Sequence, residues 1–385
     1  MPDTFTTTST QGFFSRLMNS FIGILLGPVI VIGAIILLSW NEGRAVQAIR
    51  GLDEAGGVTI EAPAAEVNPG NEGKLVHVTG QATAAGPIED SDLGVSFADQ
   101  VAVARKVEMY QWKEKKEEKE QENVGGSKTT TTTYTYSKEW SEGAIDSSQF
   151  QHPEGHENPQ MPFTSTRMTA SDAALGGFKL DSGTADKIDT SKPLKPEAPE
   201  GWVQNGNDLY KGENPSTPAI GDVRVQYAGL PSGSAVSVLA RQTGEGFSAY
   251  TTTNGYTIHL ATTGTVPAAD MIKKQQEAEA LITWILRGVG TFLIFIGFSM
   301  FFGPLAIIAS ILPFLATLVR GATGFFAFVL SIPVALITIA ISWLAFRPLI
   351  GGGILLLGLG LGYLLWRWHH NRTARHVAAA AAPAH

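Results

Sequence analysis

Long runs without a charged residue constrain this chain more than any other feature. Residues 21–40, FIGILLGPVIVIGAIILLSW, contain no charged side chain and are long enough to cross the hydrocarbon core of a bilayer. A cleaved signal peptide is the alternative, but its apolar core is normally shorter and is followed by a small-residue cleavage motif. The run here ends in SWNEGR, which has no such motif. We therefore expect an uncleaved membrane anchor over residues 21–40.

Three further charge-free intervals lie in the C-terminal part of the chain. Single arginines bound them: Arg287, Arg320, Arg347 and Arg367. The first interval is too long for one helix and too short for two crossings with a turn, and Gly303-Pro304 interrupts it. We expect one crossing that ends near Phe302, followed by a short re-entrant or interfacial segment over residues 305–319. The whole C-terminal membrane region then covers residues 288–366.

Residues 321–346 and 348–366 each predict one more crossing, so we expect four transmembrane helices. Orientation is set by the positive charge of short flanking segments. The tail over residues 367–385, which begins RWHHNRTARH, is the most basic short segment, so it should be cytoplasmic. With four crossings, residues 1–20 are then also cytoplasmic. Residues 41–287 form a large domain on the opposite side of the membrane, in the periplasm or a lumen.

The stretch over residues 106–140 has the pattern of one long β-hairpin. KVEMYQW alternates along a strand, and the charged run KEKKEEKEQE has no apolar residues at helical spacing that a helix could bury. ENVGGSK supplies a flexible reversal, and KTTTTTYTYSKEW returns with β-branched and aromatic residues. We predict a hairpin whose polar tip protrudes. Five aromatic residues lie near its base: Tyr110, Trp112, Tyr134, Tyr136 and Trp140.

Two similar segments predict a duplicated β unit. EGKLVHVTGQATAAGP begins at Glu72 and IGDVRVQYAGLPSGSA begins at Ile220, and each contains an alternating valine-rich strand between two glycines. A proline-rich linker over residues 181–219 connects the two copies. The expected fold is an α+β membrane protein, with four transmembrane helices and a large β-rich extracytoplasmic domain that holds the duplicated unit and the hairpin.

Composition argues against several classes of function. The net charge of −7 and the lack of a basic stripe argue against a nucleic-acid partner. The chain has no cysteine, so it can form neither a disulfide nor a thiolate metal site. No ionisable residue lies in the middle of an expected span, which argues against a proton-coupled transporter. Because no nucleophile elbow or phosphate-binding loop is present, we expect neither catalysis nor a cofactor.

Two short motifs are candidates for a site. HPEGHENPQ places His152 and His156 close together, but a metal needs three or four converging ligands, and a polar turn is the ordinary explanation for such a segment. NEGR, directly after the first span, could bind lipid headgroups through Arg44. The simpler interpretation is an interfacial cap in which Glu42 and Arg44 pair locally.

Glycines spaced four residues apart occur in the first and last expected spans. The pairs are Gly23 with Gly27 and Gly358 with Gly362. This spacing lets two helix backbones approach closely. Because glycine is common in membrane helices in any case, a specific packing face and simple abundance both explain it.

Several longer motifs together resemble the transmembrane protein 43 family, also called LUMA. They are WNEGRAV after the first span, RKVEMYQW, YSKEW, GHENP, YKGENPSTPAIGDVRVQYAG, and TWILRGVG before the second span. The resemblance covers nearly the whole chain and carries over no catalytic role. The positions that match the recurring motifs are Asn41, Glu42, Gly43, Arg44, Tyr110, Trp112, Trp140, His156, Asn158 and Pro159.

The resemblance implies one N-terminal span, a large extracytoplasmic loop and further spans near the C-terminus. It also implies an oligomer that takes part in membrane organisation. Eukaryotic members of the family reside in the endoplasmic reticulum and the inner nuclear membrane. The threonine run and the Gly/Ala-rich tail indicate a bacterial member, whose outer domain would face the periplasm from the inner membrane. We expect a multi-pass scaffold that forms homo-oligomers and organises membrane lipids or partner proteins.

Three alternatives to a scaffold stay open at this stage. A channel or lipid conduit is suggested by the proline-broken segment after Gly303, since re-entrant backbone must be buried in protein or line a cavity. A membrane regulator of a partner enzyme is the second. An extracytoplasmic hydrolase that uses His152 and His156 is the third.

Overall fold

The computed structural model describes residues 3–346 and residues 353, 356 and 360 of this chain. The fourth predicted crossing therefore falls almost wholly outside the described residues, and the tail over residues 367–385 falls outside them altogether, as do Gly358 and Gly362. The chain forms two compact units.

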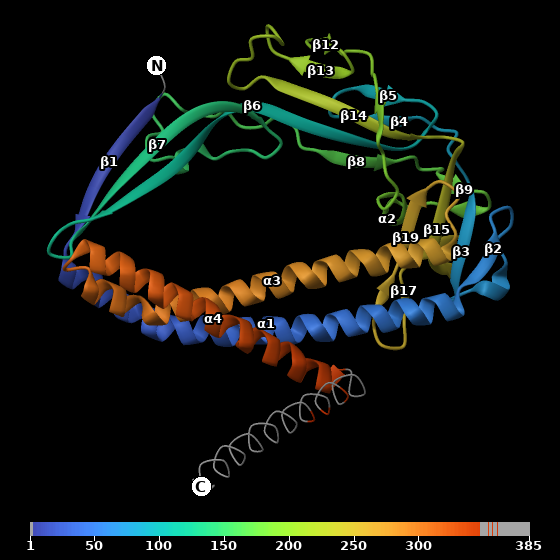
Figure 1. The fold of residues 1–385 in the computed structure, drawn as a ribbon. Coiled ribbons are helices and arrows are strands. Elements are labelled where there is room, and N and C mark those ends of the chain that lie inside the picture. Colours follow the sequence, from blue (N-terminus) through green and yellow to red (C-terminus); the bar gives the residue numbers. More distant parts are fainter. Residues whose placement is uncertain (1–2, 347–352, 354–355, 357–359, 361–385) are drawn as a thin grey trace, which may run out of the picture. The chain divides into compact units, whose positions relative to one another are not determined.

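Each unit is assembled from several chain segments. Unit 1 comprises Met1–Gln11, Ile49–Glu122 and Lys128–Ala278. Unit 2 comprises Gly12–Ala48, Asn123–Ser127 and the described residues from Glu279 onward. Unit 1 holds the sheets, and unit 2 holds the apolar parts of the long helices (Figure 1).

The first helix, α1 (Phe13–Val58), is much longer than the span expected over residues 21–40. Pro28 lies inside α1 without ending it, because neighbouring groups in a membrane helix can satisfy the carbonyl that proline leaves free. The last turns of α1 belong to unit 1, where Leu52 and Ala55 are fully buried in one apolar cluster with Leu239. Packing in the β-rich unit thus continues the helix beyond its apolar run.

Two more long helices follow the strands: α3 (Ala268–Ala309) and α4 (Pro313–Phe346). The expected break at Gly303-Pro304 is wrong, because α3 continues through Pro304. The chain turns at residues 310–312 instead, and Pro313 begins α4, a position where proline loses no hydrogen bond. Residues 305–319, expected to be a separate re-entrant or interfacial segment, are the end of α3, this turn and the beginning of α4.

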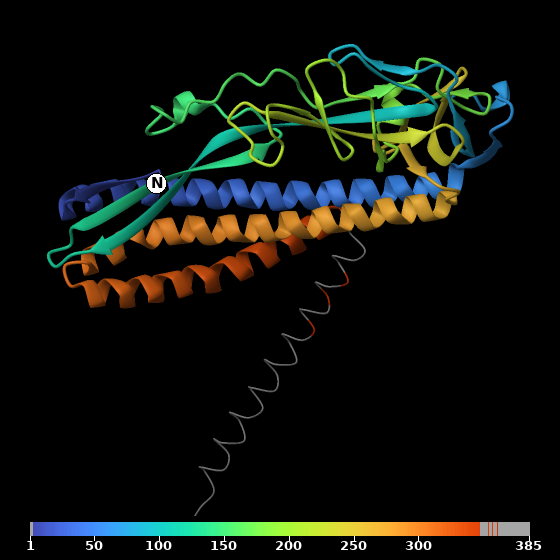
Figure 2. The same ribbon diagram turned by 90° about the horizontal axis from the view of Figure 1, so that it is seen from above.

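Among the described residues, three helices are long and apolar enough to cross a membrane: α1, α3 and α4. In unit 2, α3 lies between α1 and α4 in the view of Figure 2. The chain is therefore an integral membrane protein, and these helices correspond to three of the four predicted crossings.

The larger sheet of unit 1 has eight strands within residues 3–346. They are β1 (Thr4–Gln11), β6 (Gln100–Glu122), β7 (Lys128–Ser141), β8 (Thr166–Thr169), β11 (Lys192–Leu194), β12 (Val203–Asn205), β13 (Asp208–Lys211) and β14 (Val223–Pro231). Hydrogen bonds order them β1-β7-β6-β14-β13-β12, with β8 beside β6 and β11 beside β14.

A second sheet of seven strands completes the core of unit 1 in the described part of the chain. It consists of β2 (Ile60–Pro63), β3 (Leu75–Thr83), β9 (Ala174–Leu175), β10 (Phe178–Lys179), β15 (Ser234–Thr243), β16 (Gly246–Ser248) and β19 (Leu260–Thr263). Smaller elements are the pairs β4 (Ile88–Asp90) with β5 (Val95–Phe97) and β17 (Tyr250–Thr251) with β18 (Thr257–Ile258), and the short helix α2 (Ser182–Ala185). Val78, Val103, Val225 and Val238, drawn from both sheets, belong to one buried core.

The two predicted β copies begin with β3 and β14, which lie in different sheets. β3 pairs with β15, which follows β14, while β14 pairs with β6, which follows β3. The first strand of each copy therefore pairs with a later strand of the other copy. This reciprocal pairing is the arrangement expected of two repeats that exchange strands. The duplication itself stays a prediction.

The predicted long hairpin is confirmed. β6 and β7 pair without interruption from Met109 opposite Ser141 to Glu122 opposite Lys128 (Figure 1). The expectation that its tip protrudes is wrong, because the tip residues belong to unit 2. There the N–H of Gly125 donates to the carbonyl oxygen of Ile311, at 3.1 Å.

Two glycines explain why the tip can approach the helices so closely. Gly125 and Gly126 both have positive φ angles, of 86° and 80°. A Cβ on Gly126 would lie 2.5 Å from the ring of Phe13, so a larger residue would be both strained and overlapping. The guanidinium of Arg16, at the start of α1, donates to the carbonyl oxygen of Gly126.

The N-terminal strand β1 pairs with β7 over eight residues, from Thr4 opposite Thr135 to Gln11 opposite Lys128. Paired strands must lie in one aqueous compartment. We predicted residues 1–20 and residues 41–287 on opposite sides of the membrane, and these two placements exclude each other. The compartments stay a prediction, and the pairing provides a direct test of it.

We expect cysteines placed at Ser9 and Thr130 to form a disulfide. These residues are direct cross-strand partners, and antiparallel partners have Cα separations of about 4.5–5.5 Å, within the range that a disulfide spans. The chain contains no other cysteine, so the cross-link can be read from gel mobility after mild oxidation of intact membranes. Cysteines at Ser9 and Thr131 are the control, because adjacent strand residues point to opposite faces. A cross-link would overturn the predicted opposite placement, whereas its absence in membranes would contradict the pairing.

Candidate functional site: a polar cluster shared by three membrane helices

The NEGR motif, residues 41–44, lies inside α1 where the apolar run ends. Because four consecutive residues cover slightly more than one helical turn, they cannot all face solvent. Asn41 and Glu42 are almost completely buried, at 0% and 2% exposure. Buried polar side chains need partners, so this motif requires groups from other helices.

Glu42 joins three helices. Its carboxylate accepts hydrogen bonds from Nε of Arg287 at 2.6 Å and from Nη2 at 2.8 Å, both from α3. It also accepts a bond from the indole Nε1 of Trp343 on α4, at 2.7 Å. We call Glu42, Arg287 and Trp343 the clasp. A bidentate pair of this kind has a fixed geometry, so it holds α1 and α3 in one register.

Aromatic rings surround the cation of the clasp. The guanidinium carbon of Arg287 lies 4.7 Å from the ring centre of Trp284 and 5.8 Å from that of Trp343. Both distances allow a cation–π attraction, which strengthens where water is excluded. The two tryptophans thus stabilise the charge that Glu42 neutralises.

A second polar contact connects α1 to α3. Arg44 forms an ion pair with Glu279, and its Nη2 donates to Oγ1 of Thr283 at 3.2 Å. Nδ2 of Asn41 donates to the backbone carbonyl of Thr283 at 3.1 Å. The expected local pair between Glu42 and Arg44 is therefore wrong, since each residue pairs with α3 instead.

Each of the three helices joined by the clasp carries a tryptophan near it: Trp40 on α1, Trp284 on α3 and Trp343 on α4. Tryptophans concentrate at membrane–water boundaries, so this pattern is typical of such a boundary. On α1, Arg16 precedes Glu42 by 26 residues, or about 39 Å at 1.5 Å per residue. That length is comparable with the thickness of a bilayer including its headgroups.

The predicted glycine pair on α1 faces α3. A Cβ on Gly27 would lie 2.5 Å from the carbonyl oxygen of Gly297, and one on Gly23 would lie 2.7 Å from that of Met300. A Cβ on Gly297 would in turn lie 2.7 Å from the carbonyl oxygen of Gly27. The two backbones are therefore in direct contact, which any larger side chain would prevent.

The remaining motif residues lie in unit 1, near the base of the hairpin. His156 stacks on Tyr136 with ring centres 3.9 Å apart and meets the edge of Trp112 at 4.8 Å. Asn158 accepts a bond from the N–H of Trp112 at 2.7 Å and donates to its carbonyl oxygen at 2.9 Å. Burial, together with a hydrogen bond to Glu114, raises the pKa of Tyr136 to about 12.

The histidines of HPEGHENPQ contact aromatic rings of the same unit. His152 stacks on Phe5 of β1 with ring centres 4.3 Å apart. Among the described residues, no three His, Asp or Glu side chains are arranged to hold a metal ion. Tyr110 and Trp140 are two further motif residues, and they pack against each other with ring centres 5.3 Å apart. Pro159 packs against Gly221, because a Cβ added to Gly221 would lie 3.0 Å from Cγ of Pro159. The ring contacts of His152 and His156 anchor the hairpin and β1.

Sequence reasoning missed the residues of the polar cluster that lie on α3 and α4. Trp284 and Arg287 lie in the TWILRGVG motif, but nothing in that motif indicates a contact with the NEGR motif, hundreds of residues earlier. Trp343 and Glu279 had no signal at all. An unpaired acidic residue at the end of an apolar run was the one usable clue, because a buried carboxylate needs a cation.

Comparisons with known proteins agree with these motifs. The family model described as Transmembrane protein 43 matches residues 109–348. Transmembrane protein 43 of Rattus norvegicus is 34% identical over 359 residues, which cover 89% of this chain and 89% of that protein. The Homo sapiens protein of the same name is 33% identical over 370 residues, 92% of each chain. The homolog of Drosophila melanogaster is 29% identical over 355 residues, 87% of this chain and 91% of that one. No solved structure matches the chain.

Proposed function

The chain belongs to the transmembrane protein 43 family, and from this premise we propose that it is a membrane scaffold. In this role it assembles with copies of itself and organises the lipids or proteins around it, without catalysing a reaction. The observation that supports the proposal best is the clasp, which ties three membrane helices together at one boundary.

A scaffold must present its surface in a fixed arrangement. Apolar helices alone gain little specificity in lipid, because the surrounding acyl chains are as apolar as the helices. A buried, directional contact such as that between Glu42 and Arg287 selects one arrangement of α1 and α3. The backbone contact at Gly27 and Gly297 requires the same arrangement. Together these features favour a rigid bundle over a set of loosely associated helices.

The outer surface of the bundle is available for lipids or a second copy. Exposed aromatic residues lie along α4: Phe314, Phe325, Phe326 and Phe328. As part of the proposal, residues 41–287 are extracytoplasmic and residues 367–385 are cytoplasmic. In a bacterial cell these correspond to an inner-membrane protein with a periplasmic domain.

Native mass spectrometry of the full chain, released from membranes in a mild detergent, tests the proposal. We expect a homo-oligomer that retains lipid. A monomer without a stoichiometric partner would overturn the scaffold. A stoichiometric enzyme or transporter bound to the chain would replace the scaffold with a regulator of that partner. A tag after Ala378 permits the purification.

A matched pair of variants ties the oligomer to the clasp. Glu42→Leu leaves Arg287 unpaired, so we expect a smaller oligomer fraction than in the unmodified chain. Glu277→Leu removes an exposed carboxylate from α3 and should leave that fraction unchanged.

The conduit alternative depended on a re-entrant segment after Gly303. Because these residues continue α3, no observation specifically favours it.

A further inference from the structure

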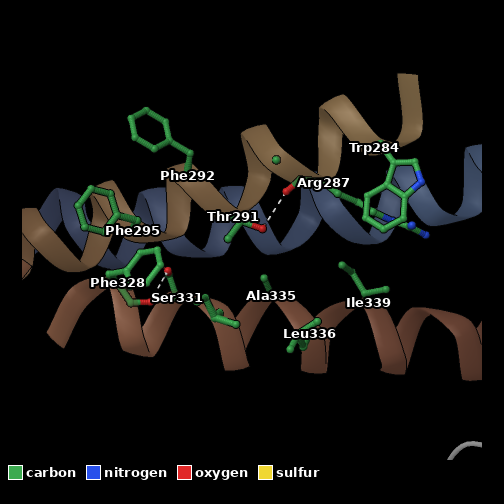
Figure 3. Close-up of a pocket in the computed structure, with 12 residues that line it drawn as sticks. Trp284, Arg287, Thr291, Phe292, Phe295, Phe328, Ser331, Ala335, Leu336 and Ile339 are labelled. Carbon is green, nitrogen blue, oxygen red and sulfur yellow. Dashed lines mark hydrogen bonds between the residues drawn. The ribbon is translucent and has the colours of Figure 1, made fainter. Parts of the chain in front are cut away.

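We propose that a furrow between α3 and α4 binds one acyl chain of a membrane phospholipid, whose polar end lies beside Arg287. The inference rests on the proposed function, because it names a lipid that the scaffold would hold. The furrow lies entirely within unit 2, and its lining residues are drawn in Figure 3. It encloses a cavity of about 630 Å³, a volume typical of ligand sites.

The furrow has a small floor and bulky sides. Gly288, Ser331 and Ala335 provide short side chains in its lining, and the last two are almost completely buried. Phe292 and Phe328 are both more than half exposed beside them. An apolar channel with this lining suits a linear alkyl chain better than a compact polar ligand.

The length of the furrow matches one leaflet of a bilayer. Its lining on α3 runs from Trp284 to Phe295, which are 11 positions apart, or about 16 Å at 1.5 Å per residue. Its lining on α4 runs from Phe328 to Ile339, which are also 11 positions apart. The hydrocarbon core is about 30 Å thick, so the furrow reaches from the tryptophan-marked boundary to about the midplane.

One end of the furrow can bind oxygen atoms. The hydroxyls of Thr291 and Ser331 already donate to carbonyls of their own helices, each at 2.8 Å (Figure 3). In Arg287, by contrast, the guanidinium uses Nε and Nη2 for its hydrogen bonds within residues 3–346. The Nη1 hydrogens can therefore donate to an ester or phosphate oxygen. A polar group at the boundary and an apolar remainder orient a phospholipid in one direction.

Photolabelling of the full chain tests the inference. The chain is placed in nanodiscs of phosphatidylcholine that carries a diazirine midway along one acyl chain, irradiated, and mapped by mass spectrometry. We expect Phe292, Phe295 and Phe328 to be labelled several-fold more than Leu25 and Ile32, which are exposed on α1. Weaker labelling of the furrow than of α1 would mean that a second copy or residues 348–366 fill it, and uniform labelling would mean an ordinary annular lipid. Either result overturns the inference.

A glycine pair provides matched variants. A Cβ on Gly288 meets no atom within 4 Å, so Gly288→Leu fits the fold but fills the furrow. We expect labelling of the three phenylalanines to fall by about tenfold, as when a side chain overpacks a site. Gly33→Leu on α1 is the control, because its Cβ also meets no atom and Gly33 does not line the furrow. Labelling that survives Gly288→Leu would contradict the site.

The oligomeric state, measured on the same nanodiscs, separates this inference from the proposed function. Monomers with a labelled furrow would refute the scaffold and leave the lipid site intact. Oligomers with uniform labelling would overturn only the lipid site.

Discussion

Glu42→Leu is expected to lower the free energy of unfolding of the membrane unit by about 3–5 kcal/mol, the usual result of removing one partner from a buried ion pair. Glu42 is 2% exposed and accepts three hydrogen bonds, two from Arg287 and one from Trp343. The substitution leaves the guanidinium without its counter-charge in a poorly hydrated site. Thermal unfolding in nanodiscs, followed by tryptophan fluorescence, measures the loss.

Two further variants separate the clasp from a general effect of removing a carboxylate. Glu277→Leu, at an exposed position of α3, should change stability by less than about 0.5 kcal/mol. The double variant Glu42→Leu with Arg287→Met replaces the pair by apolar groups and should recover most of the loss. A double variant that is as unstable as Glu42→Leu would contradict this account, since the unpaired cation would then not be the cause.

Asp90→Ala is expected to destabilise unit 1 by a similar amount, about 3–5 kcal/mol. Asp90 accepts two bonds from Nη1 of Arg105, at 2.6 and 2.8 Å, and one from the hydroxyl of Tyr227 at 2.6 Å. Both members of the ion pair are 2% exposed in their side chains. Burial, with help from the Asp90 carboxylate, raises the pKa of Tyr227 well above its ordinary value, so its hydroxyl remains a donor at physiological pH. Chemical denaturation followed by circular dichroism in the β-sheet region measures the change.

The same arginine supplies the control. Nη2 of Arg105 binds Asp92 at 2.8 Å, but the side chain of Asp92 is 60% exposed. Water can replace that partner, so Asp92→Ala should cost less than about 1 kcal/mol. Equal losses for the two variants would show that burial does not determine the strength of these pairs.

The sequence alone predicted the features that depend on local pattern. Three of the four uncharged runs correspond to α1, α3 and α4, because the length of an apolar run is itself the requirement for crossing a bilayer. The hairpin of β6 and β7 followed from alternation and from two glycines at the reversal. Its glycines indicated a turn, but they could not show that the turn contacts Ile311.

Proline positions illustrate where the local pattern misleads. Pro304 and Pro313 both predict a helix boundary, yet only Pro313 is one. A proline can remain inside a helix when other groups satisfy the carbonyl that it frees, and the sequence does not show whether such groups are near. The same difficulty explains why α1 extends to Val58, because its final turns are held by Leu52 against residues of distant strands.

The sequence by itself determined that this chain enters a membrane, that a large β-rich part interrupts its spans, and that a polar motif follows the first of them. Only the tertiary structure decided which residues that motif binds. Glu42 could pair with Arg44, two positions away, or with any cation brought near it. It pairs with Arg287, 245 positions along the chain, because helix geometry and the contact of Gly27 with Gly297 bring that guanidinium to the buried face of α1. Burial and charge pairing depend on neighbours in space, and a linear pattern specifies only neighbours along the chain.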